Sequence, residues 1–308
     1  MKFSSEMEFS GNQIKRLGKA LRDGPISDDL IRQLEDYRAA FDPLLIDMSL
    51  KLEAILAATK IPSLLTGRSK RTKSIIRKLK RVQNRGMDLS RVADIVGLRL
   101  LVENVAAQER MLELLIKELD LRDIHDYRKN PPPSGYRCVH LNIRHGSQLL
   151  EIQLRTLAQH LWAIESESFG EQTKEGKPSE DVSSYLGYIR DGVEAIEIGE
   201  PLPDSQAMPQ ILVSKRSPFT SILPTLTERF MQATKWESEE NLPGSFLLVY
   251  DRTRAQLLHE FKFKESEREQ ALREYSTFSR MVDETRFDVL VLNAATPAGL
   301  RVTHPQFF

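Results

Sequence analysis

The sequence LLEIQLRTLAQHLWAIESE, residues 149–167, changes its hydrophobic period halfway along. In its first half apolar and polar residues alternate, which is the period of a β-strand, and the polar members are Glu151, Gln153 and Arg155. From Leu157 onward the apolar residues fall at helical spacing instead. The stretch therefore predicts a strand with an acid, an amide and a base on one face, followed directly by a helix.

The segments around this stretch extend the prediction to a sheet. CVHLNIR (138–144) also alternates, and Gly146-Ser147 supplies a turn, so a hairpin is expected. DIVGLRLLV (94–102) is too apolar to be half exposed and should be a central strand. Between this strand and the hairpin, the sequence predicts a helix over about 104–119 and a strand over 121–128. The order βαβββα predicts an α+β fold, in which helices flank a mixed β-sheet.

Composition shifts divide the chain into four predicted parts. Residues 1–66 read as a helical segment, with a break at Asp42-Pro43 and an end at Thr66-Gly67. Residues 67–198 hold the sheet described above, and the proline-rich stretch 199–218 reads as a linker. Residues 219–308 follow the order ββαβα. We expect them to be a small α+β domain with a regulatory role or a role in homo-oligomerisation.

Composition also narrows the class of protein. The 308 residues carry 44 basic and 44 acidic side chains, so no global charge favours nucleic acid or a membrane. The single cysteine, Cys138, excludes an internal disulfide framework, and the start of the sequence lacks the apolar stretch of a secretory signal. We therefore expect a soluble cytoplasmic protein without a membrane partner.

Basic residues are concentrated locally. Between Arg68 and Arg91 there are ten Lys or Arg residues and one acid, Asp88. Such a run is often only a solvated helix face, but like charges this close repel one another and a bound anion would relieve the repulsion. A helix starting near Ser74, which could cap it, adds backbone donors suited to phosphate. The motif of P-loop nucleotide-binding proteins, GxxxxGK[ST], does not occur here.

Two acids are expected on the same sheet. Asp94 begins one predicted strand, and Glu151 lies on the polar face of another. Alternatively, Asp94 could be an exposed residue at a sheet edge, and Glu151 could be paired with Arg155 or Arg99. Two carboxylates about 4 Å apart repel by about 4 kcal/mol at an effective dielectric near 20, so a close pair implies a shared proton or a cation. Mg²⁺ suits carboxylate and phosphate oxygens, which favours metal-assisted phosphoryl transfer.

The segment SGYRCVH (134–140) offers a third candidate element. The Ser-Gly pair permits a tight turn, after which Tyr136 can present its ring outward, with His140 on the same side. A tyrosine here could equally be a core residue. An exposed ring would provide a stacking platform for a purine, worth roughly 1–3 kcal/mol.

Taken together, these segments resemble a known family. The blocks are the Arg68-x-Lys70-x3-Ser74-x3-Lys78 pattern, then DIVGLRL, SGYRCVH, EIQLRT and QHLWA, and their order over about residues 60–180 resembles the synthetase domain of the RelA/SpoT family. The resemblance implies a nucleotidyltransferase-like fold and transfer of the β,γ-pyrophosphate of ATP to the 3′-hydroxyl of GDP or GTP, which makes the alarmone (p)ppGpp.

The resemblance also implies residue roles. Asp94 and Glu151 would hold Mg²⁺, and Glu151 would be the base for the attacking hydroxyl. Tyr136 would stack on the acceptor guanine and His140 would contact the acceptor, while Gln153 and Arg155 would line the pocket. ATP would be bound by Arg68, Lys70, Ser74 and Lys78.

Departures from the family pattern leave the acceptor open. Family members that make the alarmone commonly have a lysine and an asparagine where this sequence has Pro132 and Ser134. Unless Arg128 or Lys129 supplies the missing charge, a 5′-polyphosphate would be held less well. Two alternatives therefore remain: pyrophosphorylation of the tRNA 3′ CCA end by a toxin or phage-defence enzyme, aided by the basic surface 71–85, or a non-catalytic nucleic-acid-binding protein.

Overall fold

The computed structural model describes residues 9–81, 86–169, 178–204, 218–235, 244–283, 286–294 and 296–308. Within them, eight strands form one sheet in the order β3-β4-β5-β2-β1-β8-β6-β7. The strands are β1 (Ser63–Ser69), β2 (Val96–Val102), β3 (Leu121–Asp126), β4 (Val139–His145), β5 (Gln148–Thr156), β6 (Gly244–Asp251), β7 (Gln256–Lys264) and β8 (Phe287–Ala294). Only the β2–β5 pair is parallel among the pairs described, so the predicted mixed sheet of an α+β fold is confirmed.

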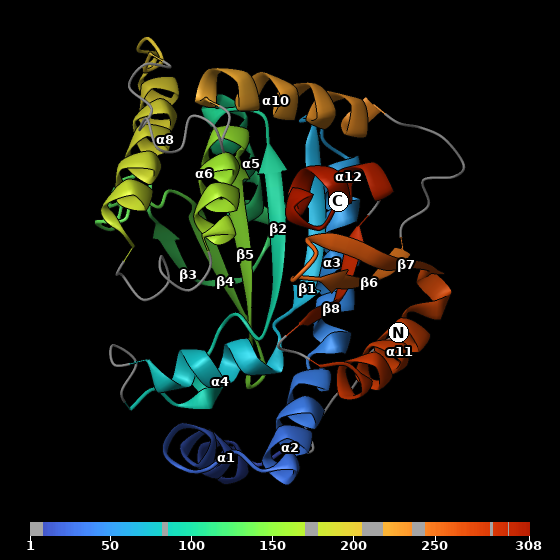
Figure 1. Ribbon diagram of the computed structural model, residues 1–308. Coiled ribbons are helices and arrows are strands. Elements are labelled where there is room, and N and C mark those ends of the chain that lie inside the picture. Colours follow the sequence, from blue (N-terminus) through green and yellow to red (C-terminus); the bar gives the residue numbers. More distant parts are fainter. Residues whose placement is uncertain are drawn as a thin grey trace.

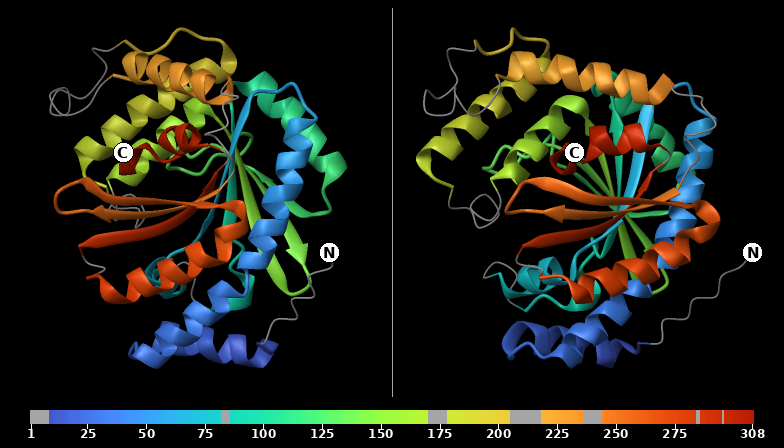
Figure 2. Two further views of the ribbon diagram at one scale, coloured as in Figure 1. Left: turned by 90° about the vertical axis from the view of Figure 1, so that its right-hand side faces the viewer. Right: turned by 45° about the vertical axis from the view of Figure 1, so that its right-hand side comes forward.

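Helices cover both faces of this sheet (Figures 1 and 2). Helices α3 and α5 lie on one face, α6 and α12 lie on the other, and α8 packs on α6. Helix α10 crosses one end of the sheet, and α1 and α2 lie beyond the other. The longer helices are α1 (Gly11–Asp23), α2 (Asp28–Ala39), α3 (Asp42–Ala57), α4 (Thr72–Lys80), α5 (Val105–Glu118), α6 (Leu157–Ser168), α8 (Glu180–Ile198), α10 (Phe219–Lys235), α11 (Arg268–Met281) and α12 (Pro297–Thr303).

The stretch 149–167 folds as its period predicts. Strand β5 runs to Thr156, and α6 begins at the next residue. The Thr156 side chain accepts a hydrogen bond from the Gln159 backbone N–H, and the Thr156 backbone N–H donates to Gln159 Oε1. This capping box fixes the transition from strand to helix. The polar face of β5 is therefore held in a defined place relative to α6.

Two local predictions are wrong. Thr66-Gly67 does not end the amino-terminal segment but lies inside β1, which pairs with β2 on one side and with β8 on the other. A β-carbon on Gly67 would lie 2.9 Å from Leu98 Cδ2, so this glycine permits close packing and makes no turn. Helix α4 begins at Thr72, so Ser74 lies inside its first turn and does not cap it.

The carboxy-terminal strands continue the same sheet. The predicted ββαβα order is confirmed by β6, β7, α11, β8 and α12, and β8 joins these strands to β1. The division into a catalytic and a small domain stays a prediction, and most of the predicted linker, residues 205–217, lies outside the described residues. Helices α8 and α10 were not anticipated from the sequence.

Separate apolar cores fill the two sides of the central strands. One lies among α1 to α5 and the apolar face of β2, β4 and β5, and the other lies among α6, α8 and α10. Among the described residues no helix is both long and apolar enough to cross a bilayer.

Two glycines of α8 provide a matched test of this packing. A β-carbon on Gly192 would lie 2.8–3.0 Å from the buried Phe219 ring, whereas on Gly187 the nearest side-chain atom would be 4.0 Å away. We expect Gly192→Ala to destabilise the protein by about 1–2 kcal/mol because a rigid ring must move. Gly187→Ala should stabilise it by about 0.5–1 kcal/mol through helix propensity. Urea unfolding of both variants measures this, and equal effects would contradict the described packing.

Candidate active site

Polar side chains from four adjacent strands share one face of the sheet. Strand register pairs Thr66 with Arg99, Arg99 with Gln153, Gln153 with His140, and Gly97 with Glu151. Paired residues project to the same side of a sheet. A small pocket of about 30 Å³ opens on this face. It is lined by Thr66, Arg68, Asp94, Gly97, Leu98, Arg99, Glu151, Gln153 and His304.

Asp94 is held by two lysines. Lys70 Nζ lies 2.5 Å from Asp94 Oδ2, and Lys78 Nζ lies 2.8 Å from Asp94 Oδ1. Lys70 directly follows β1, and Lys78 lies on α4, so the two elements that carry the basic segment converge on one carboxylate. Burial alone would raise the pKa of Asp94, but the two ammonium groups outweigh it and hold the pKa well below its usual range.

Glu151 belongs to a closed ring of five hydrogen-bonded side chains. His140 Nδ1 lies 2.9 Å from Glu151 Oε2, and His140 Nε2 lies 2.7 Å from the Tyr136 hydroxyl. Arg155 Nη2 donates to that hydroxyl at 2.9 Å and to Gln153 Oε1 at 2.8 Å. Gln153 Nε2 closes the ring by donating to Glu151 Oε1 at 2.7 Å. Each member thus fixes the orientation of the next.

This cycle of hydrogen-bonded side chains favours the protonated form of His140. Burial alone would lower the pKa of His140, but hydrogen bonds with Cys138 and Glu151 raise it to about 9. A protonated imidazole donates from both nitrogens, and His140 would donate one proton toward Glu151 and the other toward Tyr136. Burial likewise acts to raise the pKa of Glu151, but the hydrogen bond from His140 keeps it below its usual value, so this carboxylate is ionised at neutral pH.

The structure brings together most of the residues singled out from the sequence. Asp94, Glu151, Arg68 and Gln153 line the pocket itself. Two lysines, Lys70 and Lys78, contact the lining residue Asp94. The hydrogen-bonded ring that includes the lining residue Glu151 also contains Tyr136, His140 and Arg155. Ser74 is half-buried on α4, one turn before Lys78, and does not line the pocket.

Tyr136 differs from its predicted orientation. Its hydroxyl points into the ring of hydrogen bonds rather than outward, because a phenol removed from water needs hydrogen-bond partners. Its ring meets Trp162 and Tyr127 edge-on, with centroids 5.9 and 5.7 Å apart, and the Arg155 guanidinium lies 5.4 Å from its centroid. The ring is half-buried, so a base could reach only the part that these neighbours leave open.

Sequence reasoning considered Arg99 only as a possible partner of Glu151, and it missed His304. Arg99 interrupts an apolar strand, a signal that could have been used, and burial together with Arg155 lowers its pKa to about 9. His304 gave no signal, because it reaches the pocket from the far end of the chain. Arg99 Nη1 donates to the Thr303 carbonyl at 2.7 Å, and His160 Nε2 lies 3.1 Å from the Val302 carbonyl, so residues 302–304 are held against the pocket.

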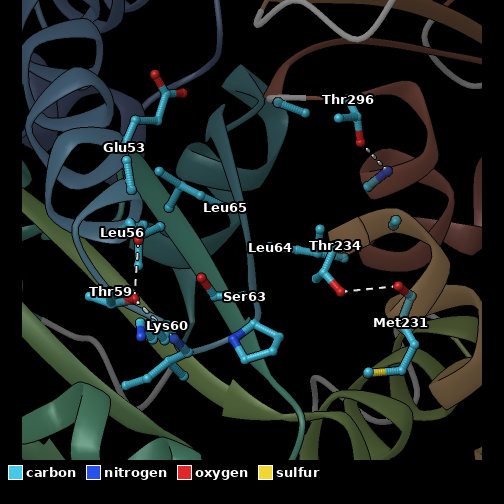
Figure 3. A pocket seen from close by; sticks show the side chains of 16 residues that line it. Glu53, Leu56, Thr59, Lys60, Ser63, Leu64, Leu65, Met231, Thr234 and Thr296 are labelled. Atoms are coloured by element: carbon cyan, nitrogen blue, oxygen red, sulfur yellow. Dashed lines mark hydrogen bonds between the residues drawn. The ribbon is translucent and has the colours of Figure 1, made fainter. Parts of the chain in front are cut away.

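A second pocket is larger but has fewer charged residues in its lining. It has a volume of about 640 Å³ and lies where α3 meets the start of β1, α10 and α12 (Figure 3). Glu53 and Lys60 are the charged residues in its lining, and most of the others are apolar or carry hydroxyls. Because convergent charged groups mark catalytic sites better than volume does, we assign the candidate active site to the smaller pocket.

The Asp94 cluster predicts an acid-dependent loss of stability. The pKa of Asp94 is lower in the folded protein than its ordinary value of 3.8, so its contribution is full above that pH and is lost as the pH falls further. We expect Asp94→Asn to lose less thermal stability than the wild type between pH 6 and pH 3, by about 3 °C. Calorimetry with the exposed Asp120→Asn as control measures this, and an identical loss in wild type and Asp94→Asn would contradict the ion-pair cluster.

Comparisons with known proteins identify the region around this site. Residues 67–169 match the sequence model described as "Region found in RelA / SpoT proteins". The chain is 31% identical over 166 residues to an uncharacterised protein of Mycobacterium tuberculosis, covering 52% of this chain and 58% of that protein. It is 34% identical over 108 residues to the GTP pyrophosphokinase YjbM of Bacillus subtilis, covering 32% and 51%. The chain thus spans only about half the length of these curated relatives.

Two solved structures are similar to part of this chain. The small alarmone synthetase 1 of Bacillus subtilis, bound to its product pppGpp, superposes with a TM-score of 0.46 at 26% identity, covering 55% of this chain and 94% of that one. A GTP pyrophosphokinase family protein of Streptococcus pneumoniae gives a TM-score of 0.44 at 24% identity, covering 56% and 92%. The residues that match the RelA/SpoT region, 67–169, contain Asp94, Glu151 and the basic segment.

Proposed function

We propose that this protein transfers the β,γ-pyrophosphate of ATP to the 3′-hydroxyl of GDP or GTP. The observation that carries the proposal is that Asp94 and Glu151, remote in sequence, line one pocket together with Arg68. The family match of residues 67–169 and the similarity to a GTP pyrophosphokinase support it. Cytoplasmic residence and homo-oligomerisation stay predictions.

The donor atoms of the pocket fit Mg²⁺. The ion usually takes one or two carboxylates and completes its shell with water and substrate phosphates, and Asp94 and Glu151 are two such carboxylates. Among the described residues no third acidic, histidine or cysteine ligand joins them. Two ammonium groups are paired with Asp94, which supports a cation at this carboxylate. When bound, Mg²⁺ would neutralise charge on the transferred phosphates.

The side chains of the site would have different roles in this reaction. Lys70, Lys78 and Arg68 would bind the phosphates of ATP once the lysines exchange Asp94 for phosphate oxygens. Glu151 would take the proton of the acceptor 3′-hydroxyl as its oxygen bonds to the β-phosphorus. The bond between the β-phosphorus and the oxygen that bridges it to the α-phosphorus breaks, and AMP leaves. His140 and Gln153 would keep the Glu151 carboxylate oriented toward the acceptor.

One finding favours a second acceptor. Arg128, a candidate for the missing acceptor-side charge, donates to Asp126 at 2.7 Å and to Glu109 at 2.8 Å, and its side chain is only 8% exposed. It is therefore committed to structural contacts. Lys129 is exposed, and its ion pair with Asp126 is a long one of 3.9 Å, so its ammonium group could still reach a ligand. Lys129 is then the one remaining candidate for holding an acceptor 5′-polyphosphate. The tRNA 3′ end needs no such site and is therefore the second candidate acceptor. The basic surface 71–85 would support it, although residues 82–85 lie outside the described part of the chain.

A transfer assay distinguishes these functions. Purified protein is incubated with Mg²⁺, ATP labelled in the γ-phosphate, and GDP, GTP or bulk tRNA. Label on guanosine nucleotides supports the first proposal, and label on tRNA supports the second. Absence of transfer to every acceptor would overturn both and leave the non-catalytic nucleic-acid-binding protein.

Glu151→Gln tests the proposed base. The amide keeps the shape of the side chain but can neither accept the proton nor ligate Mg²⁺ as strongly, so transfer should fall at least about 100-fold while ATP binding is retained. Exposed Glu113→Gln on α5 is the matched control and should keep wild-type activity. Full activity of Glu151→Gln would refute the assignment.

His304→Ala tests whether the small pocket receives ATP. A volume of about 30 Å³ holds roughly one water molecule, so the pocket must widen to admit a nucleotide. Removing the imidazole should lower the KM for ATP about threefold, because less of the binding energy is spent on opening the pocket. Exposed His145→Ala is the control. An unchanged or raised KM in a folded His304→Ala variant would place ATP elsewhere.

A further inference from the structure

The loop that joins β3 to β4, residues 127–138, is closed at its base and turned at its tip. The Tyr127 backbone amide donates to the Cys138 carbonyl at 2.9 Å, and the Gly135 amide donates to the Pro132 carbonyl at 2.8 Å. Gly135 has a φ of 81°, which disfavours any residue with a side chain. This loop carries Tyr136, so its position decides where the phenol of the hydrogen-bonded ring lies.

Helix α8 packs against this loop. A β-carbon on Gly135 would lie 2.6 Å from Arg190 Cδ, so the loop backbone already touches the arginine side chain. Glu197 follows Arg190 by two helical turns and therefore lies on the same face of α8. Its carboxylate is 2.5 Å from Arg137 Nε, and its side chain is only 7% exposed. Arg137 is the residue directly after Tyr136.

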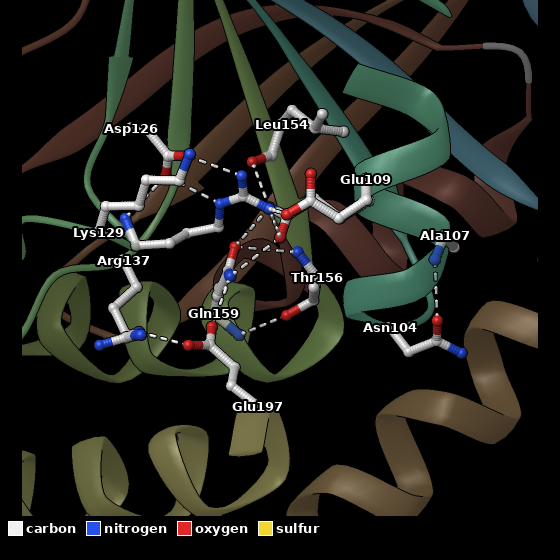
Figure 4. Close-up of polar contacts among 12 residues, drawn as sticks. Asn104, Ala107, Glu109, Asp126, Lys129, Arg137, Leu154, Thr156, Gln159 and Glu197 are labelled. Atoms are coloured by element: carbon white, nitrogen blue, oxygen red, sulfur yellow. Dashed lines mark hydrogen bonds and ion pairs between the residues drawn. The ribbon is translucent and has the colours of Figure 1, made fainter. Parts of the chain in front are cut away.

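Glu197 also bonds to the start of α6. Gln159 Nε2 donates to Glu197 Oε1 at 2.6 Å, and Gln159 is fully buried in the capping box that follows β5 (Figure 4). One carboxylate therefore connects the loop bearing Tyr136 to the helix that continues the strand bearing Glu151. The connection is short, charged and largely shielded from water, so it is stronger than a surface ion pair.

The other end of the loop is held by the same chain of contacts. Arg128 donates to Gln108 Oε1 at 3.2 Å, and Gln108 Nε2 donates to Gln159 Oε1 at 2.8 Å. Arg128, Gln108, Gln159, Glu197 and Arg137 thus form a continuous polar path that joins both ends of the loop across α5, α6 and α8 (Figure 4).

We propose that Glu197 is a positioning residue for the acceptor side of the active site. It acts through Arg137 and does not touch the reacting atoms. Its buried charge holds Arg137, and Arg137 holds the adjacent Tyr136 in the ring that orients His140 and Glu151. The role in catalysis rests on the proposed function, because it needs an acceptor bound beside Tyr136. The role in holding the loop does not.

The first test compares Glu197→Gln with Glu194→Gln in the full chain. Glu194 is an exposed residue of the same helix, which makes it a matched control. Glutamine keeps the size of the side chain but leaves Arg137 without its buried counter-charge. We expect Glu197→Gln to raise the KM for the acceptor about tenfold, with the KM for ATP within about twofold of wild type. Parallel losses for both substrates would show a merely structural role.

Coupling to Arg137 is tested by a double-variant cycle. If Glu197 acts through Arg137, then Arg137→Gln raises the acceptor KM as Glu197→Gln does, and the double variant raises it no further. Multiplicative effects of the two substitutions would overturn the proposed route.

Hydrogen exchange gives a readout that does not depend on activity. Peptides covering 127–138 should exchange faster in Glu197→Gln than in wild type and Glu194→Gln, while peptides from β2 and β5 should be unchanged. Unchanged exchange in 127–138 would overturn the proposal even if transfer is observed. Faster exchange without any transfer activity would support the loop-holding role and count against the proposed function instead.

Discussion

The site depends on the pairing of charges on a sheet face that is largely shielded from water. Charged groups in such surroundings are tolerated only when each has a partner, since an unpaired buried ion is strongly destabilising. Asp94 is paired with Lys70 and Lys78, and Glu151 is held by His140 and Gln153. The two carboxylates are therefore ionised, oriented and already surrounded by cationic groups. In the proposed reaction, ATP with its cation would replace these partners without creating a new unpaired charge.

Strand period predicted the chemistry of this face well. Alternation alone placed Glu151, Gln153 and Arg155 together, and the structure shows them linked by hydrogen bonds. It also predicted the hairpin of β4 and β5 and the central place of β2. These features depend on neighbours close in sequence, for which local periodicity carries the information.

Contacts between residues far apart in the chain could not be predicted from the sequence. Strand β1 was missed because the Thr66-Gly67 pair resembles a turn, whereas its pairing with both β2 and β8 makes it a central strand. His304 reaches the pocket only because β8 brings the end of the chain beside β1. Helix α8 shows the same limit, since its contact with the Tyr136 loop depends on how α6 and α8 pack. No local pattern reveals such a contact.

The arrangement of the carboxy-terminal strands bears on how the site works. Because β6, β7 and β8 extend the sheet, residues 302–304 lie against the candidate active site as part of one continuous structure. His304, one of these residues, lines the small pocket. The lining of the candidate active site therefore includes a side chain outside residues 67–169 as well as those within them.

The most direct measurement is a crystal structure with Mg²⁺ and an ATP analogue that cannot be cleaved between its α- and β-phosphates. The account predicts phosphate oxygens within hydrogen-bonding distance of Lys70 and Lys78 and an ion bound by Asp94 and Glu151. A nucleotide found in the larger pocket beside Glu53 and Lys60, or bound away from both carboxylates, would contradict it.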